Sequence, residues 1–148
     1  MKNLVDSIFL DTYNILISYT YGMQDIICAL APFTSCSVSE NKITVESKLF
    51  GLKNTFRIVF SFNTDFIDYI SIFSSQADSE GRELFRRVQR KMVCFFGPPS
   101  NIIESFLNSF NNDYKRHIWR LNNVKITHSF WEHFGFCEEI NIQLIDTA

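Results

Sequence analysis

The fold of this chain is best approached from residues 117–145, which have the sequence HIWRLNNVKITHSFWEHFGFCEEINIQLI. Asn122-Asn123 predicts a tight β-turn, because asparagine tolerates the left-handed backbone that two-residue hairpin loops require. The turn sets the register of the strands on either side of it, since side chains alternate between the two faces of a strand. The predicted cross-strand pairs, all on one face, are Leu121 with Val124, Trp119 with Ile126, and His117 with His128.

A third strand follows this hairpin. Ile140, Ile142 and Leu144 alternate with polar residues, so they form an apolar face that continues the apolar face of the hairpin. The end of the chain therefore predicts three neighbouring strands.

Three more strands are expected earlier in the chain. Apolar and polar residues alternate over 43–49 and again over 56–62, on either side of a turn at 51–54, which predicts a hairpin with one buried face. The stretch 66–73 is more continuously apolar, so we place it near the centre of the sheet.

Two helices are predicted between these groups of strands. Asp78 or Ser79 begins a helix that runs to Phe96, where Gly97-Pro98-Pro99 stops it. Asn101, followed three residues later by Glu104, has the pattern of a capping box. It predicts a second helix over residues 101–110.

The first thirty residues are harder to assign. Apolar residues recur in steps of three and four over residues 3–30, which predicts a helix that Gly22 breaks and Pro32 ends. Residues 15–21 are β-branched and aromatic and would also suit a strand, so both alternatives stay open.

These elements predict a single α+β domain over residues 1–148, in the order α-βββ-αα-βββ. Runs of strands separated by helices favour a mostly antiparallel sheet, here of about six strands, with the helices packed on one face. A chain of 148 residues is long enough to bury a core of its own.

Composition narrows the functional class. The formal net charge is -2, which makes nucleic acid an unlikely partner and mildly favours a basic one. No apolar run reaches the roughly 20 residues needed to span a bilayer, so we expect a cytoplasmic protein with reduced cysteines. No Cys-x-x-Cys pair supports a zinc ribbon.

His117 and His128 are the strongest metal-binding candidates. The hairpin register places their Cβ atoms about 5 Å apart, and His133, Cys137 or Glu138 lie close enough in sequence to complete a site. Their spacing matches no zinc signature, so we favour ordinary polar residues near the end of a strand pair and expect no bound metal.

No catalytic residue can be assigned. The chain has neither a G-x-S-x-G elbow nor a phosphate-binding glycine loop, and it has only 5 glycines. We therefore expect a protein that is not an enzyme and carries no cofactor.

Two surfaces are candidates for binding a partner. The first is aromatic and acidic, with large rigid side chains of the kind that dominate protein interfaces. A place in the core is the favoured alternative for these aromatic residues. The residues of this surface are Trp131, Glu132, His133, Phe134, Phe136, Glu138 and Glu139.

The second surface is a basic helix face. Such a stripe can bind phosphates. A solvated helix face is the commoner explanation, and Glu83 can pair with Arg87 one turn away. Its residues are Arg82, Arg86, Arg87, Arg90 and Lys91.

In size, acidity, order of helices and strands and strand-turn-strand ending, the chain resembles small bacterial immunity proteins, including those that oppose contact-dependent growth-inhibition toxins. The resemblance rests on the segment from His117 to Trp131 and on the strand at 138–145. It implies a cytoplasmic protein that binds and neutralises a cognate toxin, here a basic one. A nucleic-acid-binding or regulatory module that uses the basic helix face is the alternative.

Overall fold

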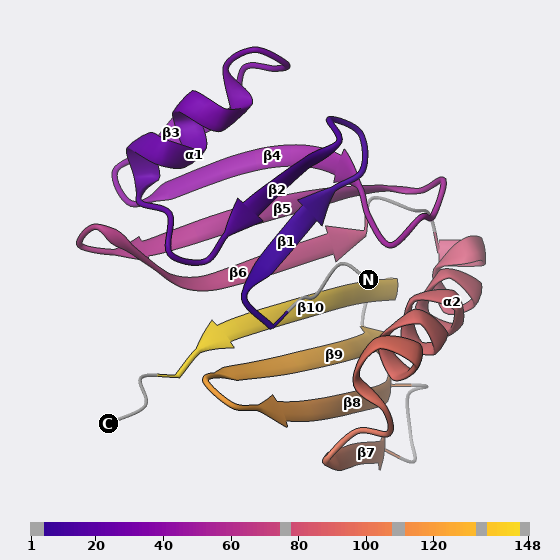
Figure 1. Ribbon diagram of the computed structural model, residues 1–148. Coiled ribbons are helices and arrows are strands. Elements are labelled where there is room, and N and C mark those ends of the chain that lie inside the picture. Colours follow the sequence, from indigo (N-terminus) through magenta and orange to yellow (C-terminus); the bar gives the residue numbers. More distant parts are fainter. Residues whose placement is uncertain (1–4, 75–77, 108–111, 133–135, 146–148) are drawn as a thin grey trace.

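The computed structural model describes residues 5–74, 78–107, 112–132 and 136–145. Its main feature is an antiparallel sheet of eight strands in the order β3-β4-β5-β6-β10-β9-β8-β7, accompanied by a separate two-stranded hairpin and two helices. Figure 1 shows α1, α2 and the β1–β2 hairpin on the same side of this sheet. The α+β class and the antiparallel sheet are therefore confirmed, whereas the strand number and order are not those predicted.

The sheet consists of two four-stranded meanders. The first contains β3 (Ser37–Ser39), β4 (Lys42–Lys48), β5 (Thr55–Asn63) and β6 (Phe66–Ser74), and the second contains β7 (Asn101–Leu107), β8 (Asn112–Leu121), β9 (Val124–Glu132) and β10 (Phe136–Leu144). The last strands of the two meanders, β6 and β10, pair with each other. This pairing places β6 in the middle of the sheet, as predicted.

The Asn122-Asn123 turn forms as predicted. Asn122 adopts a left-handed φ of 49°. The register that follows places Leu121 opposite Val124, Trp119 opposite Ile126 and His117 opposite His128. Asn122 thus supplies the left-handed residue of the turn that joins β8 to β9.

The N-terminal helix prediction is wrong for most of its length. The chain forms β1 (Ser7–Leu10) and β2 (Ile15–Ser18), and only α1 (Met23–Leu30) is helical. Asn14 takes a left-handed φ of 56° in the connection, and Gly22 is the N-cap of α1 rather than a break within a longer helix. The β-branched residues prefer the extended backbone because a sheet lies beneath them to bury one side of the hairpin.

The prediction of a second helix at 101–110 is also wrong. Residues 101–107 form β7, which pairs with β8; residues 108–111 lie outside the described part of the chain. The capping pattern of Asn101 and Glu104 did not produce a helix. A strand forms instead, because the backbone groups at the edge of β8 gain hydrogen-bond partners when a strand lies beside them.

The long helix α2 (Asp78–Phe96) ends where the sequence predicts. Gly97 has a φ of 77° and donates its backbone N–H to the Val93 carbonyl over 2.8 Å. The Gly97 carbonyl in turn accepts a hydrogen bond of 3.0 Å from Nε1 of Trp119. The end of α2 is therefore attached to β8.

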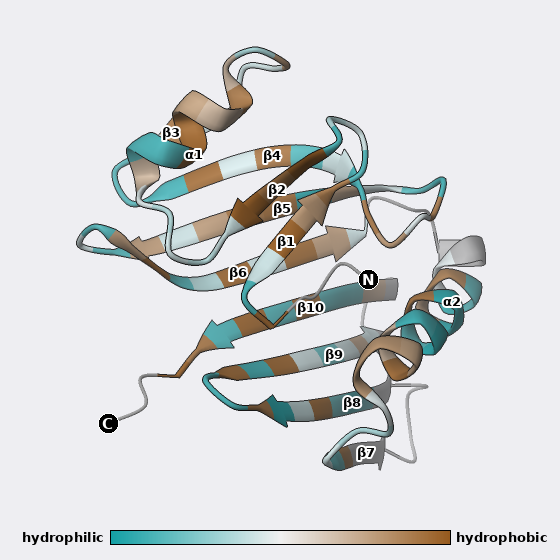
Figure 2. Ribbon diagram, in the orientation of Figure 1, coloured by the Kyte–Doolittle hydropathy of each residue, from teal (hydrophilic) through white to brown (hydrophobic). Residues whose placement is uncertain are grey.

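The core lies between the sheet and the layer formed by α1, α2 and the hairpin. Bands of apolar and polar residues alternate along the strands in Figure 2, because one face of each strand points into this core. The buried residues include Ile8, Leu10, Ile17, Ile26, Leu30, Ile43, Ile58, Phe60, Ile72, Leu84, Val88, Met92, Trp119, Ile126 and Ile140.

Candidate functional site

His128 lies at the centre of a buried polar cluster between α2 and the sheet. Its Nε2 is 2.7 Å from Oε1 of Glu138 on β10, and its Nδ1 is 2.6 Å from Oε1 of Gln89 on α2. The ring of Phe85 stacks on the imidazole with centroids 4.1 Å apart. We call His128, Gln89, Glu138 and Phe85 the histidine cluster.

Strand alternation brings these residues together. His128 shares the core-facing side of β9 with Ile126, and Glu138 shares that side of β10 with Ile140, which pairs with His128. On α2, Gln89 follows Phe85 by four residues and therefore lies one turn along the same helix face. Three elements thus each place one polar group at the same point.

Burial sets the charge of this cluster. The side chains of His128 and Glu138 are 0% and 2% exposed. Removal from water lowers the pKa of His128 from 6.5 to about 3 and raises the pKa of Glu138 from 4.5 to about 8, because each charged form loses its hydration. Near neutral pH the pair therefore holds no net charge.

The hydrogen bonds agree with this assignment. With both groups neutral, Nδ1 donates a hydrogen bond to the Gln89 oxygen and the Glu138 carboxyl donates one to Nε2. The second carboxyl oxygen of Glu138 is buried and has no hydrogen-bond partner in the described part of the chain. The cluster anchors α2 to the sheet, and both histidine nitrogens are already engaged.

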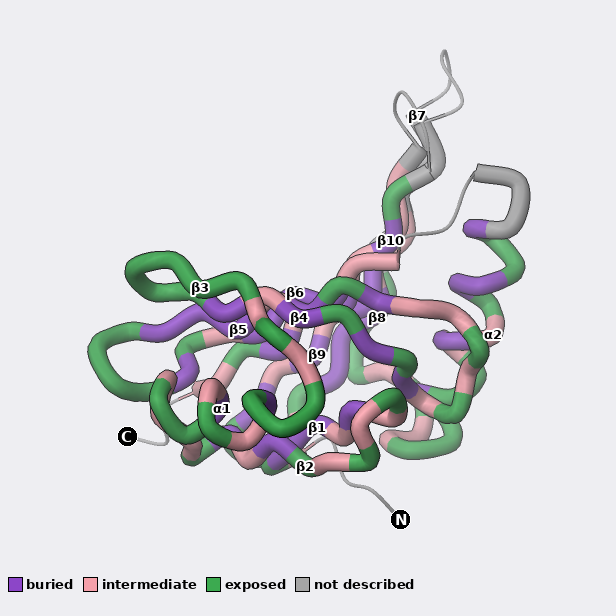
Figure 3. The backbone as a smooth tube through the Cα atoms, turned by 90° about the horizontal axis from the view of Figure 1, so that it is seen from above, coloured by how far each residue is buried: buried purple, intermediate pink, exposed green. Residues whose placement is uncertain are grey.

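The face of the sheet opposite the helices is the second notable feature. In Figures 1 and 3, no described helix covers it. Phe73 of β6 and Trp131 of β9 are half-buried on this face, and the guanidinium of Arg57 lies 5.4 Å from the centre of the Phe73 ring. We call this surface the open face.

Basic residues outnumber acidic residues on the open face. The register and side-chain alternation assign its charged members. The acidic residues are Glu46 and Glu139, with Asp68 at the position where the β5–β6 register shifts. The basic residues are Lys42, Lys48, Arg57, Arg116, Arg120 and Lys125.

The chain matches no family model, no curated protein and no solved structure among those compared.

His117 and His128 are cross-strand neighbours, as the sequence predicted. Both nitrogens of His128 are occupied, and exposed Cys137 lies on the open face, away from the two histidines. Within the described residues, no group of three or more potential ligands could hold a metal ion. His133 lies outside these residues.

The predicted aromatic and acidic surface is divided between the two faces of the sheet. Trp131 and Glu139 are half-buried on the open face. Glu138 points into the core, so it is not part of an acidic rim, because alternation turns it away from its neighbour Glu139. The side chains of Glu132, His133, Phe134 and Phe136 lie outside the described part.

The basic helix face is largely exposed to solvent. Arg82, Arg86, Arg90 and Lys91 are exposed, whereas Arg87 is half-buried. Glu83 pairs with Arg86 at 3.9 Å, not with Arg87 as expected. Both partners of this pair are mostly exposed, so it contributes little to stability.

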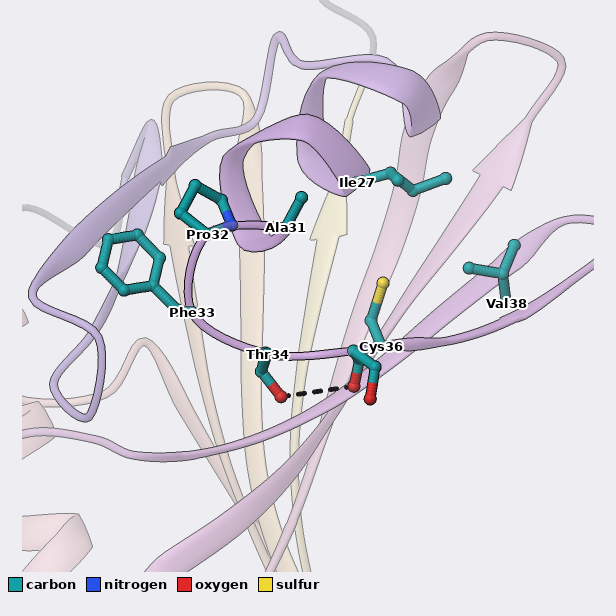
Figure 4. Close-up of a pocket in the computed structure, with 8 residues that line it drawn as sticks. Ile27, Ala31, Pro32, Phe33, Thr34, Cys36 and Val38 are labelled. Carbon is teal, nitrogen blue, oxygen red and sulfur yellow. Dashed lines mark hydrogen bonds between the residues drawn. The ribbon is translucent and has the colours of Figure 1, made fainter.

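A cavity of about 580 Å³ lies between the end of α1 and β3 (Figure 4). Cys36 turns its sulfur toward α1, and Thr34 donates a hydrogen bond to the Ser35 carbonyl over 3.3 Å. Phe33 and Val38, also in the lining, are 53% and 49% exposed. No charged side chain lies among the described residues of its lining.

Sequence reasoning missed Gln89 as the partner of His128. A signal was present, because Gln89 is an uncharged polar residue that follows buried Val88 and lies one turn after buried Phe85 on α2. Such a residue needs a hydrogen-bond partner once the helix packs. The identity of that partner depends on how α2 crosses β9, which periodicity does not specify.

Among the described residues, no helix is both long and apolar enough to cross a lipid bilayer.

Proposed function

We propose that this is a non-enzymatic binding protein that neutralises a protein toxin by direct contact, in the manner of an immunity protein. The observation that carries the proposal is the open face. Eight strands present a broad surface that no described helix covers, and Trp131 and Phe73 lie partly exposed on it. Large rigid aromatic side chains of this kind supply most of the energy in protein interfaces.

The surroundings of Phe73 support docking through this face. Arg57 lies over the ring, and Glu139 is the cross-strand neighbour of Phe73 on the other side. Glu46 is the cross-strand neighbour of Arg57. An aromatic anchor flanked by charges of both signs gives both contact area and orientation to a partner.

The charge of the open face indicates which charge the contact surface of the partner should carry. The net charge of the chain favours a basic toxin, yet basic residues predominate on the open face itself. A partner docking there gains most from an acidic patch, because complementary charges speed association and fix the register. We therefore propose an acidic contact surface on the toxin.

The histidine cluster favours binding over catalysis. A general acid or base must come within hydrogen-bond reach of the substrate, and His128 is fully buried with both nitrogens bonded. The cluster is better explained as an anchor for α2.

Co-expression with the product of the adjacent gene tests the proposal. We expect the two proteins to copurify, and Trp131→Ala and Phe73→Ala each to weaken binding by about tenfold or more, as expected for interface anchors. Arg90→Ala on the helix side is the control and should leave affinity unchanged. A chain that stays alone, or a control that weakens binding as much as Trp131→Ala, would contradict the proposal.

The exposed basic helix face supports a second candidate, binding of nucleic acid through α2. The observation in its favour is the exposure of Arg82, Arg86, Arg90 and Lys91 along one helix. This candidate predicts salt-sensitive retention of RNA or DNA that disappears in the double variant Arg86→Glu with Arg90→Glu. Retention that persists in the double variant rules it out.

A further inference from the structure

A second, smaller cavity lies where the first half of α2 meets β8 and β9. It has a volume of about 210 Å³ and is lined by Arg82, Phe85, Arg86, Lys115 and Phe130. Every described lining residue is either cationic or aromatic. We call this cavity the basic pocket.

The fold requires these side chains to converge. Arg82, Phe85 and Arg86 are spaced three and four residues apart, so they share one side of α2. Lys115 and Phe130 are directly opposite each other on β8 and β9. The pocket is therefore formed by one helix face and one cross-strand pair, and neither can shift without repacking the core.

The inner wall is held rigidly. Phe85 is 6% exposed. Its ring meets Phe130 edge-on with centroids 4.7 Å apart, and it stacks on His128. One turn further along α2, Gln89 bonds to His128 at 2.6 Å. This anchoring pre-organises the wall, which reduces the entropy that a ligand would lose on binding.

The electrostatics of the pocket favour an anion. Three cationic side chains border one cavity, and no described carboxylate lines it, although Glu104 of β7 is the register partner of Lys115. Glu83 is more than half exposed and lies 3.9 Å from Arg86, where solvent screens its effect. Arginine in particular matches the planar geometry of carboxylate and phosphate groups.

The size and lining of the pocket restrict the ligand further. The volume is below the roughly 300–1,000 Å³ of pockets for drug-sized molecules, so the pocket is too small to enclose a whole nucleotide or peptide. Phe85 and Phe130 provide apolar surface beside the charges. We propose that the basic pocket binds a small organic anion, a carboxylate or phosphate group attached to a short planar apolar body.

Calorimetric titration of the full chain with four probes tests this site. Benzoate and phenyl phosphate represent the two anionic groups on an apolar body, inorganic phosphate lacks that body, and benzyl alcohol lacks the charge. We expect saturable, salt-sensitive binding of at least one of the first two probes. Inorganic phosphate and benzyl alcohol should bind at least about tenfold more weakly.

Variants assign the binding to the pocket. The double variant Arg82→Gln with Lys115→Gln should weaken binding of the best probe by about tenfold or more, because it removes two charge-assisted contacts. Arg90→Gln is the matched control, since Arg90 is an exposed arginine of the same helix outside the lining. Circular dichroism of each variant checks that it is folded.

Three outcomes would overturn the assignment. They are the absence of saturable binding by both aromatic anions, equal binding of inorganic phosphate and phenyl phosphate, and an equal loss of binding in Arg90→Gln. Binding of a toxin to the open face does not change the result of these titrations. Failure of the basic pocket would therefore not contradict the proposed function, and failure of the proposed function would not contradict the basic pocket.

Discussion

Each half of the eight-stranded sheet has four antiparallel strands covered by a helix. The two halves differ in the polarity of the side chains buried between sheet and helix. Under α1 and the hairpin, most of the described side chains in that space are apolar, with Ile43, Ile58 and Phe60 at 0% exposure. Under α2, the polar residues His128 and Glu138 are also buried. The same topology thus accepts an apolar or a polar interior.

The difference shows how each half positions its covering layer. Apolar burial is non-directional, so the first half depends on the fit of many side chains. Hydrogen bonds are directional, and the bonds of Gln89 and Glu138 to His128 fix both the rotation and the position of α2 on the sheet. The basic pocket depends on this fixed position.

The largest effect is expected in the apolar half. Phe60→Ala should lower the free energy of unfolding by about 3–5 kcal/mol, because it removes a fully buried ring and leaves a cavity. Urea unfolding followed by circular dichroism measures it. Phe66→Ala is the control, since Phe66 is 65% exposed, and it should change stability by less than about 0.5 kcal/mol. Equal effects in the two variants would show that Phe60 does not contribute as a core residue.

A smaller loss is expected from the histidine cluster. His128→Leu should cost about 1–3 kcal/mol, because it leaves half-buried Gln89 and buried Glu138 without their partner. Replacing all three polar residues by leucine should recover much of that loss, since no buried polar group then lacks a partner. If the single variant is as stable as the triple variant in urea unfolding, the cluster has no role as a unit.

The smallest effect is a dependence of stability on pH. The pKa of Glu138 is raised from 4.5 to about 8, so its contribution is complete below pH 4.5 and is lost as the pH rises toward 8. The pKa of His128 is lowered from 6.5 to about 3, so its contribution is complete above pH 6.5 and is lost as the pH falls toward 3. The two slopes cancel between pH 4.5 and 6.5.

The cluster therefore predicts a plateau of stability in that window and a decline on each side. Urea midpoints measured at half-unit pH steps trace this profile. Glu138→Gln keeps a hydrogen-bonding group but removes the titrating carboxyl, so it should flatten the decline between pH 6.5 and 8. A variant that keeps the wild-type slope there would assign the dependence to another group.

The contrast between the two halves also explains which parts of the fold were predictable. The β8–β9 register followed from Asn122-Asn123, and the end of α2 followed from Gly97, because in both places a local backbone requirement decides the conformation. The stretches 7–10 and 101–107 were predicted as helix and formed strands, and residues 15–18, left open between helix and strand, formed a strand. Their residues suit either state, and the decision came from distant partners.

The candidate sites also contain features that the local sequence predicts and features that depend on residues far apart in the chain. The proximity of His117 and His128 was predictable from the turn, whereas the bond from Gln89 to His128 joins residues 39 positions apart. The open face combines strands from both halves of the chain. The net charge of -2 therefore does not reveal that basic residues outnumber acidic residues on this face. The basic pocket likewise joins a helix and two strands that no local pattern connects.

By itself, the sequence determined the local features: the alternation of apolar residues in the strands, the asparagine turn and the stop after α2. Those features depend on backbone preferences and on side chains within a few residues of each other. Only the tertiary structure decided that β6 pairs with β10, which face of the sheet stays open and that His128 is buried against Glu138. The physical reason is that burial and desolvation act on groups brought together by the whole fold, and a single segment does not contain that information.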